Sequence, residues 1–181
     1  MKGCVPFNDE VLMHPLAKLI VDVPDFPQPG ILFRDITPLL RSHFREAVSA
    51  LDALWSDREW SEAEVVAGIE SRGFILAAAL AEKRGKGFVP VRKKGKLPPP
   101  IVDRTYDLEY GSGVLEMQRG AGRLILVDDV LATGGTLGAS AALATDAGFR
   151  VLHTGVLIDL GLRKDFRCLG EAPRAVIRYG D

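Results

Sequence analysis

The chain has few of the residues that mark disulfide-bonded, metal-binding or membrane-spanning proteins. Its two cysteines, Cys4 and Cys168, lack the spacing of a metal or redox motif. They favour a reduced protein without structural disulfides. No run approaches the roughly 18 apolar residues of a membrane span, and the N-terminal residues lack the apolar core of a secretory signal. We therefore expect a cytoplasmic protein that does not enter a membrane.

The chain also lacks an excess of charge of either sign. It contains 23 lysines and arginines against 24 aspartates and glutamates, a net charge of −1. Nothing therefore attracts the whole molecule to nucleic acid or to an anionic membrane. The three histidines are scattered, and each is interpreted as a surface or core residue. With 181 residues, of which 47% are hydrophobic, the chain is long enough for one domain, residues 1–181, and short for two.

Segments typical of strands and helices alternate from residue 64 onward. Strands are expected at 64–69, 87–91, 123–128, 151–158 and 175–179, helices at 71–84 and 136–147, and a hairpin around residues 111–113. This alternation predicts an α/β fold with a mainly parallel central sheet flanked by helices. Because such sheets bind ligands beyond the carboxyl ends of their strands, residues 70–73, 92–96, 128–136 and 159 are expected near one crevice.

The first part of the chain is less regular. We expect a short helix within residues 9–22, a proline-rich turn or loop at 23–30 and a short strand at 31–33. The apolar residues that follow have helical spacing, which predicts a helix over residues 42–55 with Ser42 as its N-cap.

The stretch LILVDDVLATGGTLGAS, residues 124–140, raises the main functional question. It predicts a buried strand that ends on Asp128 and Asp129, then a loop of small residues, then a helix. Glycines let backbone amides approach a ligand closely, and a helix N-terminus attracts anions, so this loop is suited to a phosphate. A glycine-rich turn without a ligand is the alternative. The lysine of a Walker loop and the third glycine of a dinucleotide fingerprint are both missing.

The two carboxylates beside this loop are informative because they would repel an anion. They suit a ligand that brings hydroxyl groups to be accepted, or a cation to be balanced. A ribose that carries a 5-phosphate meets both conditions. Since neighbouring residues of an extended segment point in opposite directions, one acid can reach the sugar while the other serves the loop or a magnesium shell.

The sequence VDDVLATGGT resembles the ribose-phosphate signature of the type I phosphoribosyltransferases, enzymes that use 5-phosphoribosyl 1-pyrophosphate. The resemblance implies the fold of that family, with a small N-terminal hood at about residues 8–40, a core at about 41–181 and a flexible β-hairpin loop. It also implies Mg²⁺ that arrives with the substrate and has no direct protein ligand, reaching Asp128 or Asp129 through water. The residues implied for the ribose and its 5-phosphate are Asp128, Asp129, Ala132, Thr133, Gly134, Gly135 and Thr136.

Further segments resemble the family members that act on adenine. PDFPQPGILFRDITPLL, residues 24–40, resembles their base-binding hood. The resemblance implies that Leu32, Phe33 and Leu160 cover the faces of the base, while the backbone of Arg34 reads its edge. Taken by themselves, the three apolar residues could equally be ordinary core positions.

Three charged segments complete the resemblance. ESRGF, residues 70–74, resembles the pyrophosphate loop, including a cis peptide at Glu70–Ser71, and RKKGKLP, residues 92–98, adds cations, one of which would reach the second subunit of a homodimer. The residues implied for pyrophosphate are Glu70, Ser71, Arg72, Gly73, Arg92, Lys93 and Lys96. YDLEYG, residues 106–111, resembles the catalytic loop, which implies catalytic roles for Glu109 and Tyr110. The alternatives for these segments are a simple helix start, a solvated basic loop and a hairpin with an exposed acid, and without the resemblance only the last would be favoured.

The implied reaction joins adenine to 5-phosphoribosyl 1-pyrophosphate and yields AMP and pyrophosphate. One alternative is a related enzyme for hypoxanthine, guanine or xanthine, which the hood sequence disfavours. The other is a non-enzymatic sensor of 5-phosphoribosyl 1-pyrophosphate that controls transcription or RNA. The chain shows neither an added helix-turn-helix segment nor a positive net charge, so no nucleic-acid partner is expected.

Overall fold

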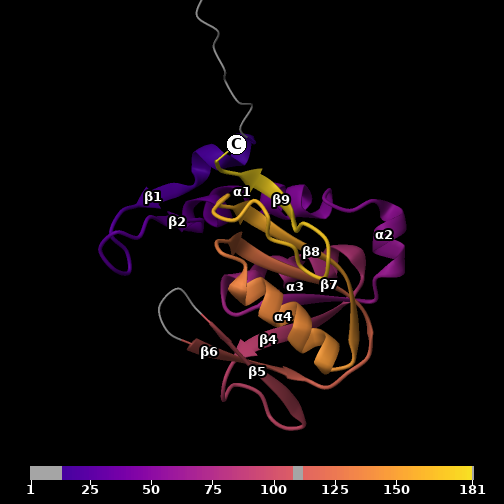
Figure 1. Cartoon of the computed structure of the whole chain (residues 1–181). Helices are drawn as coiled ribbons and strands as arrows, with labels where there is room; N and C mark the ends of the chain where they lie inside the picture. The colour runs from indigo at the N-terminus through magenta and orange to yellow at the C-terminus, as the bar shows by residue number, and fades with distance from the viewer. Residues whose placement is uncertain (1–13, 108–111, 181) are drawn as a thin grey trace, which may run out of the picture.

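The computed structural model describes residues 14–107 and 112–180, which form a large sheet with helices on both faces and a separate two-stranded sheet (Figure 1). The large sheet has seven strands in the order β5-β6-β4-β3-β7-β8-β9. Five of them, from β4 to β9 in that order, run parallel, and β5 and β6 add an antiparallel hairpin at one edge. The predicted α/β fold with a mainly parallel central sheet is therefore confirmed.

The strands of the large sheet are β3 (Val65–Ile69), β4 (Gly87–Lys93), β5 (Ile101–Asp107), β6 (Ser112–Gln118), β7 (Gly122–Leu131), β8 (Phe149–Asp159) and β9 (Arg174–Arg178). The helices are α1 (Thr37–Asp52), α2 (Asp57–Glu62), α3 (Arg72–Arg84) and α4 (Gly135–Asp146). Gly85 ends α3 in a left-handed conformation with φ of 61°, as expected for a glycine C-cap. No described helix is long and apolar enough to cross a membrane.

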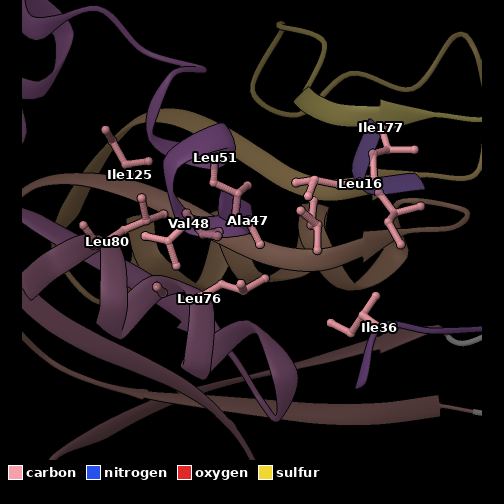
Figure 2. Close-up of a cluster of buried hydrophobic side chains, with 14 of the residues drawn as sticks. Leu16, Ile36, Ala47, Val48, Leu51, Leu76, Leu80, Ile125 and Ile177 are labelled. Carbon is pink, nitrogen blue, oxygen red and sulfur yellow. The ribbon is translucent and has the colours of Figure 1, made fainter. Parts of the chain in front are cut away.

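Two hydrophobic clusters hold the layers together, one on each face of the sheet. In the first, α1 and α3 pack on the sheet through residues such as Val48 and Leu80 (Figure 2). In the second, α4 and the β5–β6 hairpin cover the opposite face. Ile125 belongs to the first cluster and its neighbour Leu126 to the second, so β7 is buried on both sides. This double burial explains why β7 is a continuous apolar run rather than an alternating one.

The hood differs in detail from the sequence prediction. In place of a helix within residues 9–22, the described part contains the short 3₁₀ helix η1 (Pro15–Leu19) and the strand β1 (Val21–Val23); residues 9–13 lie outside the described ranges. The expected strand at 31–33 is β2 (Phe33–Asp35), which pairs antiparallel with β1. Its start is delayed because Ile31 still belongs to the proline-rich turn, where it bonds to Gln28 and Phe26.

Helix α1 begins earlier than predicted. Its first turn contains Pro38, and the carboxylate of Asp35 accepts the N–H of Thr37 at 2.9 Å. Ser42 is therefore inside the helix and is not an N-cap; its hydroxyl donates to the carbonyl of Pro38 at 2.8 Å. The helix is kinked at the next residue, His43, which has φ of −137° and ψ of 41°. The short helix α2 carries a complete capping box between Ser56 and Glu59.

Strand β7 continues past the point where the sequence predicted its end. It runs through Asp128 and Asp129 to Leu131, because β8 pairs with it as far as Leu131 and Asp159. The prediction that the strand ends on the acid pair was wrong. Both carboxylates therefore sit on a rigid central strand rather than in a loop.

Candidate active site

The two acids of β7 are buried together at the carboxyl end of the sheet. Asp128 is 9% exposed and Asp129 7%. The Oδ1 atom of Asp128 accepts the N–H of Asp129 at 2.9 Å. A Cβ atom at Gly73 would lie 2.7 Å from the same oxygen, so the first turn of α3 approaches the acid only because residue 73 is glycine. Burial, and then the charge of Asp129, raise the pKa of Asp128 well above its ordinary value.

Arg72, in the first turn of α3, connects the acid pair with the hood. Its Nη2 lies 2.7 Å from Oδ2 of Asp129, and its Nη1 donates to the carbonyl of Arg34 at 3.4 Å. The guanidinium also lies 4.9 Å from the centre of the Phe33 ring. Oδ2 of Asp129 nevertheless accepts no well-aligned hydrogen bond from any described residue, so the contact is an ion pair of poor geometry. A substrate that offers a hydroxyl to Asp129 and an anion to Arg72 could replace it.

The loop after β7 leads into α4 and carries the predicted phosphate residues 132–136. Gly134 has φ of 90° and occupies the N-cap position of α4, where no described side chain caps the helix. The first N–H groups of α4 and the positive end of its dipole therefore lie at this loop. Phe166 packs closely on the glycine, since a Cβ at Gly134 would come within 2.4 Å of its ring.

A cavity of about 420 Å³ lies between the hood and the core, within the usual range for small-molecule sites. All four residues predicted for the base line it: Leu32, Phe33, Arg34 and Leu160. Its remaining lining residues are Gly30, Ile31, Arg72, Val130, Ala132 and Leu162. Leu162 was not predicted, because nothing in its sequence context sets it apart.

The side chain of Arg34 contacts β1 and the C-terminal part of the chain. The guanidinium pairs with Asp22 of β1 and lies 4.2 Å from the centre of the Tyr179 ring, just after β9. These contacts hold the side chain in place and connect the hood with the C-terminal part of the chain. The role of Tyr179 was missed, since it follows from a contact between opposite ends of the sequence.

The basic segment after β4 lies beside the end of β3. Oε2 of Glu70 accepts the N–H of Lys93 at 2.9 Å and Nε of Arg92 at 3.3 Å. The Lys93 hydrogen bond is the main reason why the pKa of Glu70 falls below its ordinary value. The Glu70 side chain therefore holds the basic segment in place. The peptide between Glu70 and Ser71 is cis, as the resemblance implied.

Comparison with known proteins agrees with this geometry. The phosphoribosyl transferase domain family matches residues 42–167. An adenine phosphoribosyltransferase from Hydrogenovibrio crunogenus is 48% identical over 169 residues, which are 93% of this chain and 98% of the relative. The chain belongs to the adenine phosphoribosyltransferase family. The crystal structure of the Rhodothermus marinus adenine phosphoribosyltransferase is 43% identical, with a TM-score of 0.79 over 90% of this chain and 96% of that one.

A third relative was crystallised with ligands. The adenine phosphoribosyltransferase of Saccharomyces cerevisiae, complexed with adenine and D-2,5-dideoxy-2,5-imino-altritol 1,6-bisphosphate, is 32% identical, with a TM-score of 0.76 over 88% of this chain and 94% of that one. The two ligands of that protein are a purine base and a phosphorylated sugar analogue.

The proposed catalytic loop of this phosphoribosyltransferase falls at the tip of the β5–β6 hairpin. The predicted hairpin is present, but Ser112 and Gly113 lie in β6, opposite Asp107 and Tyr106, and not in the turn as predicted. Glu109 and Tyr110 lie outside the described residues, so their roles stay predictions.

Proposed function

We propose that this phosphoribosyltransferase moves the 5-phosphoribosyl group from 5-phosphoribosyl 1-pyrophosphate to N9 of adenine, giving AMP and pyrophosphate. The observation that carries the proposal is the position of Arg72. It lines the base-sized cavity and at the same time pairs with Asp129. A base in the cavity and a sugar at the acid pair would therefore be neighbours, as a transfer between them requires.

In the proposed reaction, the bond from C1 of the ribose to the pyrophosphate oxygen breaks, and N9 of adenine attacks the opposite face of the sugar. Positive charge builds on the ribose ring at the transition state. Asp128 and Asp129 accept its hydroxyl groups and stabilise that charge electrostatically. Because Asp128 is buried beside another acid, a developing cation is especially favourable there.

The remaining predicted residues bind the parts of the substrates that do not react. The amides and hydroxyls of residues 132–136, with the N-terminus of α4, hold the 5-phosphate and so position C1. The leaving pyrophosphate is bound by Ser71, Arg72, Gly73, Arg92, Lys93 and Lys96. Glu70 acts on this subsite through its hydrogen bonds to Arg92 and Lys93.

In the base site, the apolar faces of Leu32, Phe33 and Leu160 sandwich the purine. Backbone groups of Arg34 read its edge and select the hydrogen-donating 6-amino group over a 6-oxo group. On the hairpin, Glu109, with Tyr110 beside it, handles a proton on the imidazole side of adenine as N9 forms its new bond. Closure of the hairpin would exclude water from the activated sugar.

The residues at the acid pair fit a Mg²⁺ ion that arrives with the substrate. Oδ2 of Asp129 is buried and accepts no hydrogen bond from a described residue, which leaves it available to a water of the ion's shell. Within residues 14–107 and 112–180, no three His, Cys, Asp or Glu side chains gather to hold an ion by themselves. Mg²⁺ commonly keeps waters and substrate phosphates as ligands. When bound, it would neutralise charge on the leaving pyrophosphate.

We also propose that the enzyme is a cytoplasmic homodimer. Phe44 on α1, Ile75 on α3 and Phe88 on β4 are 37%, 47% and 39% exposed. Exposed apolar side chains of this size, on neighbouring elements of one face, suit contact with a second copy. The buried thiol of Cys168 has no disulfide partner among residues 14–107 and 112–180, which suits a reducing compartment.

The proposal is tested by incubating the protein with 5-phosphoribosyl 1-pyrophosphate, Mg²⁺ and one purine base at a time. We expect AMP from adenine, and at least about 100-fold lower kcat/KM with hypoxanthine, guanine or xanthine, because a 6-oxo group leaves buried polar groups unpaired. A preference for another base would overturn the adenine assignment. Binding of 5-phosphoribosyl 1-pyrophosphate without any nucleotide product would favour the sensor.

A further inference from the structure

Glu116 is a buried acid that neither the predicted site nor the reaction above uses. It lies in the middle of β6 and is 1% exposed, between Leu115 and Met117, which are also buried. An ionised carboxylate in such a place is costly unless hydrogen bonds compensate for its lost water. Its surroundings therefore have to supply donors.

The donors come from the turn that follows β4. The carboxylate of Glu116 accepts the N–H groups of Gly95 at 2.8 Å, Lys96 at 2.5 Å and Leu97 at 2.5 Å. Three consecutive amides thus converge on one side chain about 20 residues away in the sequence. The turn has few other ways to satisfy these groups, and Gly95 adopts φ of 80°, which a glycine tolerates. We call residues 92–97 the basic turn.

The sheet brings Glu116 to this turn. Glu116 is directly opposite Arg92 in the antiparallel pairing of β4 with β6, so their side chains share one face. The chain leaves β4 after Lys93 and folds back over Glu116, while the N–H of Lys94 still bonds to Val114. On the other side of the turn, Glu70 binds Arg92 and Lys93. One acid within β6 and one directly after β3 therefore hold the basic turn.

The electrostatics agree with this role. Burial acts to raise the pKa of Glu116, but the hydrogen bonds from Gly95, Lys96 and Leu97 outweigh it and hold the pKa below its ordinary value. The carboxylate therefore stays charged and offsets part of the repulsion among Arg92, Lys93, Lys94 and Lys96.

We propose that Glu116 is a positioning residue for the pyrophosphate subsite: its buried carboxylate folds the basic turn into the shape in which the turn's cations meet the leaving pyrophosphate. Glu116 itself touches no substrate. The inference rests on the proposed function for the identity of the anion. It predicts an effect on the affinity for pyrophosphate-bearing ligands and none on the affinity for adenine.

The test compares Glu116→Gln with the wild type. Glutamine keeps the shape but replaces one acceptor with a donor that faces an N–H group. We expect the KM for 5-phosphoribosyl 1-pyrophosphate, and the dissociation constant of inorganic pyrophosphate measured by calorimetry, to rise about tenfold or more. The KM for adenine should stay within about twofold, since adenine's predicted site lies at the hood.

A matched control is Glu64→Gln. Glu64 also accepts a backbone N–H, that of Arg123 at 2.8 Å, but at the amino ends of β3 and β7, far from the basic turn. Glu64→Gln should leave the KM for adenine and the KM for 5-phosphoribosyl 1-pyrophosphate unchanged. Glu116→Asp, which keeps the charge on a shorter side chain, should retain part of the pyrophosphate affinity, and it serves as the second variant if Glu116→Gln does not fold.

Unchanged affinity for pyrophosphate in a folded Glu116→Gln protein would overturn the proposal. So would an equal rise of both substrate constants, which would indicate general damage to the fold. If Glu116→Gln does not fold, the same constants are measured for Glu116→Asp. A weaker affinity for pyrophosphate with an unchanged KM for adenine supports the proposal. An equal change of both constants overturns it. If the wild type makes no AMP, the proposed function fails, but calorimetry with pyrophosphate still tests Glu116 separately.

Discussion

Acidic side chains meet different partners at the two ends of the seven-stranded sheet. At the amino end, Asp52 faces Arg84 with contacts of 2.5 and 3.0 Å, and Glu59 faces Arg174 at 2.5 Å. At the carboxyl end, Asp128 and Asp129 are adjacent, and among the described residues Arg72 is the one cation within 4 Å of either carboxylate. The acids at the amino end are each paired with an arginine, whereas the two acids of β7 share a single one. The other acids at the carboxyl end, Glu70 and Asp159, are paired with Arg92 and Arg178.

The pKa values follow the same division. Hydrogen bonds from Arg174, and then from the backbone of Ser56, lower the pKa of Glu59 to about 2. Burial and the neighbouring acid raise the pKa of Asp128. Acids that are paired within the fold stabilise it, while acids left beside one another lower its stability and are retained for a ligand that completes them. Neutralising an acid of the β7 pair should therefore lower activity, whereas neutralising a paired acid at the amino end should lower stability.

The largest effect is expected for Asp129→Asn. The amide cannot stabilise positive charge on the ribose ring, so kcat/KM should fall by about 10²–10³-fold. Steady-state kinetics with adenine and 5-phosphoribosyl 1-pyrophosphate measure this loss, and circular dichroism checks the fold. A variant within threefold of the wild-type rate would show that Asp129 has no part in stabilising the transition state.

At the amino end, Asp52→Asn should lower the stability of the fold and leave the activity unchanged. The substitution removes the charge from the hydrogen bonds to Arg84, and it removes the ion pair of Lys83, which lies 3.3 Å from the acid and also donates to Ser49. The free energy of unfolding should fall by about 2 kcal/mol. Urea denaturation measures it, with kcat expected to stay at the wild-type value. A loss of activity in a fully folded variant would contradict the division between the two ends.

The sequence was sufficient where the signals were local. The apolar run of β7 and the glycine after α3 predicted those elements, and the Asp-Asp pair followed by a glycine loop predicted the position of the candidate site. Strand β7 was predicted too short because its last residues are held by pairing with β8, which a single segment does not encode. Likewise, the delayed start of β2 depends on hydrogen bonds within the preceding turn.

Most of what the sequence did not predict are contacts between segments that are distant in the chain. Glu116 looks like the polar residue of an edge strand, and only the fold reveals that three amides of the basic turn surround it. Arg72 was predicted for pyrophosphate, but its pairing with Asp129 and its place in the base cavity depend on how α3 packs against β7. Such contacts follow from tertiary packing and leave no periodic trace in the sequence.

A smaller effect, opposite in sign to that of Asp52→Asn, is expected for Asp128→Asn. Because the pKa of Asp128 is raised in the folded state, folding is opposed once pH exceeds the ordinary aspartate value. Asparagine removes this cost, so the variant should gain about 0.5–2 kcal/mol at pH 8 while losing activity. The gain should shrink toward pH 4, where the wild-type acid is protonated. Thermal unfolding of the wild type and of Asp128→Asn between pH 4 and 8 tests this prediction. A variant that is less stable than the wild type at pH 8 would contradict it.

The smallest effect concerns Glu59, whose side chain is 26% exposed. Its folded pKa of about 2 lies below the ordinary 4.5, so the carboxylate adds stability above pH 4.5 that is lost as pH falls toward 2. Solvent screening limits this to about 1 kcal/mol or less. Unfolding of Glu59→Gln and wild type should therefore differ most at pH 6 to 8 and converge as the pH falls to about 2, whereas the exposed control Glu62→Gln should match the wild type throughout. A difference that widens toward low pH would mean that the amino end is not stabilised by the charge of Glu59.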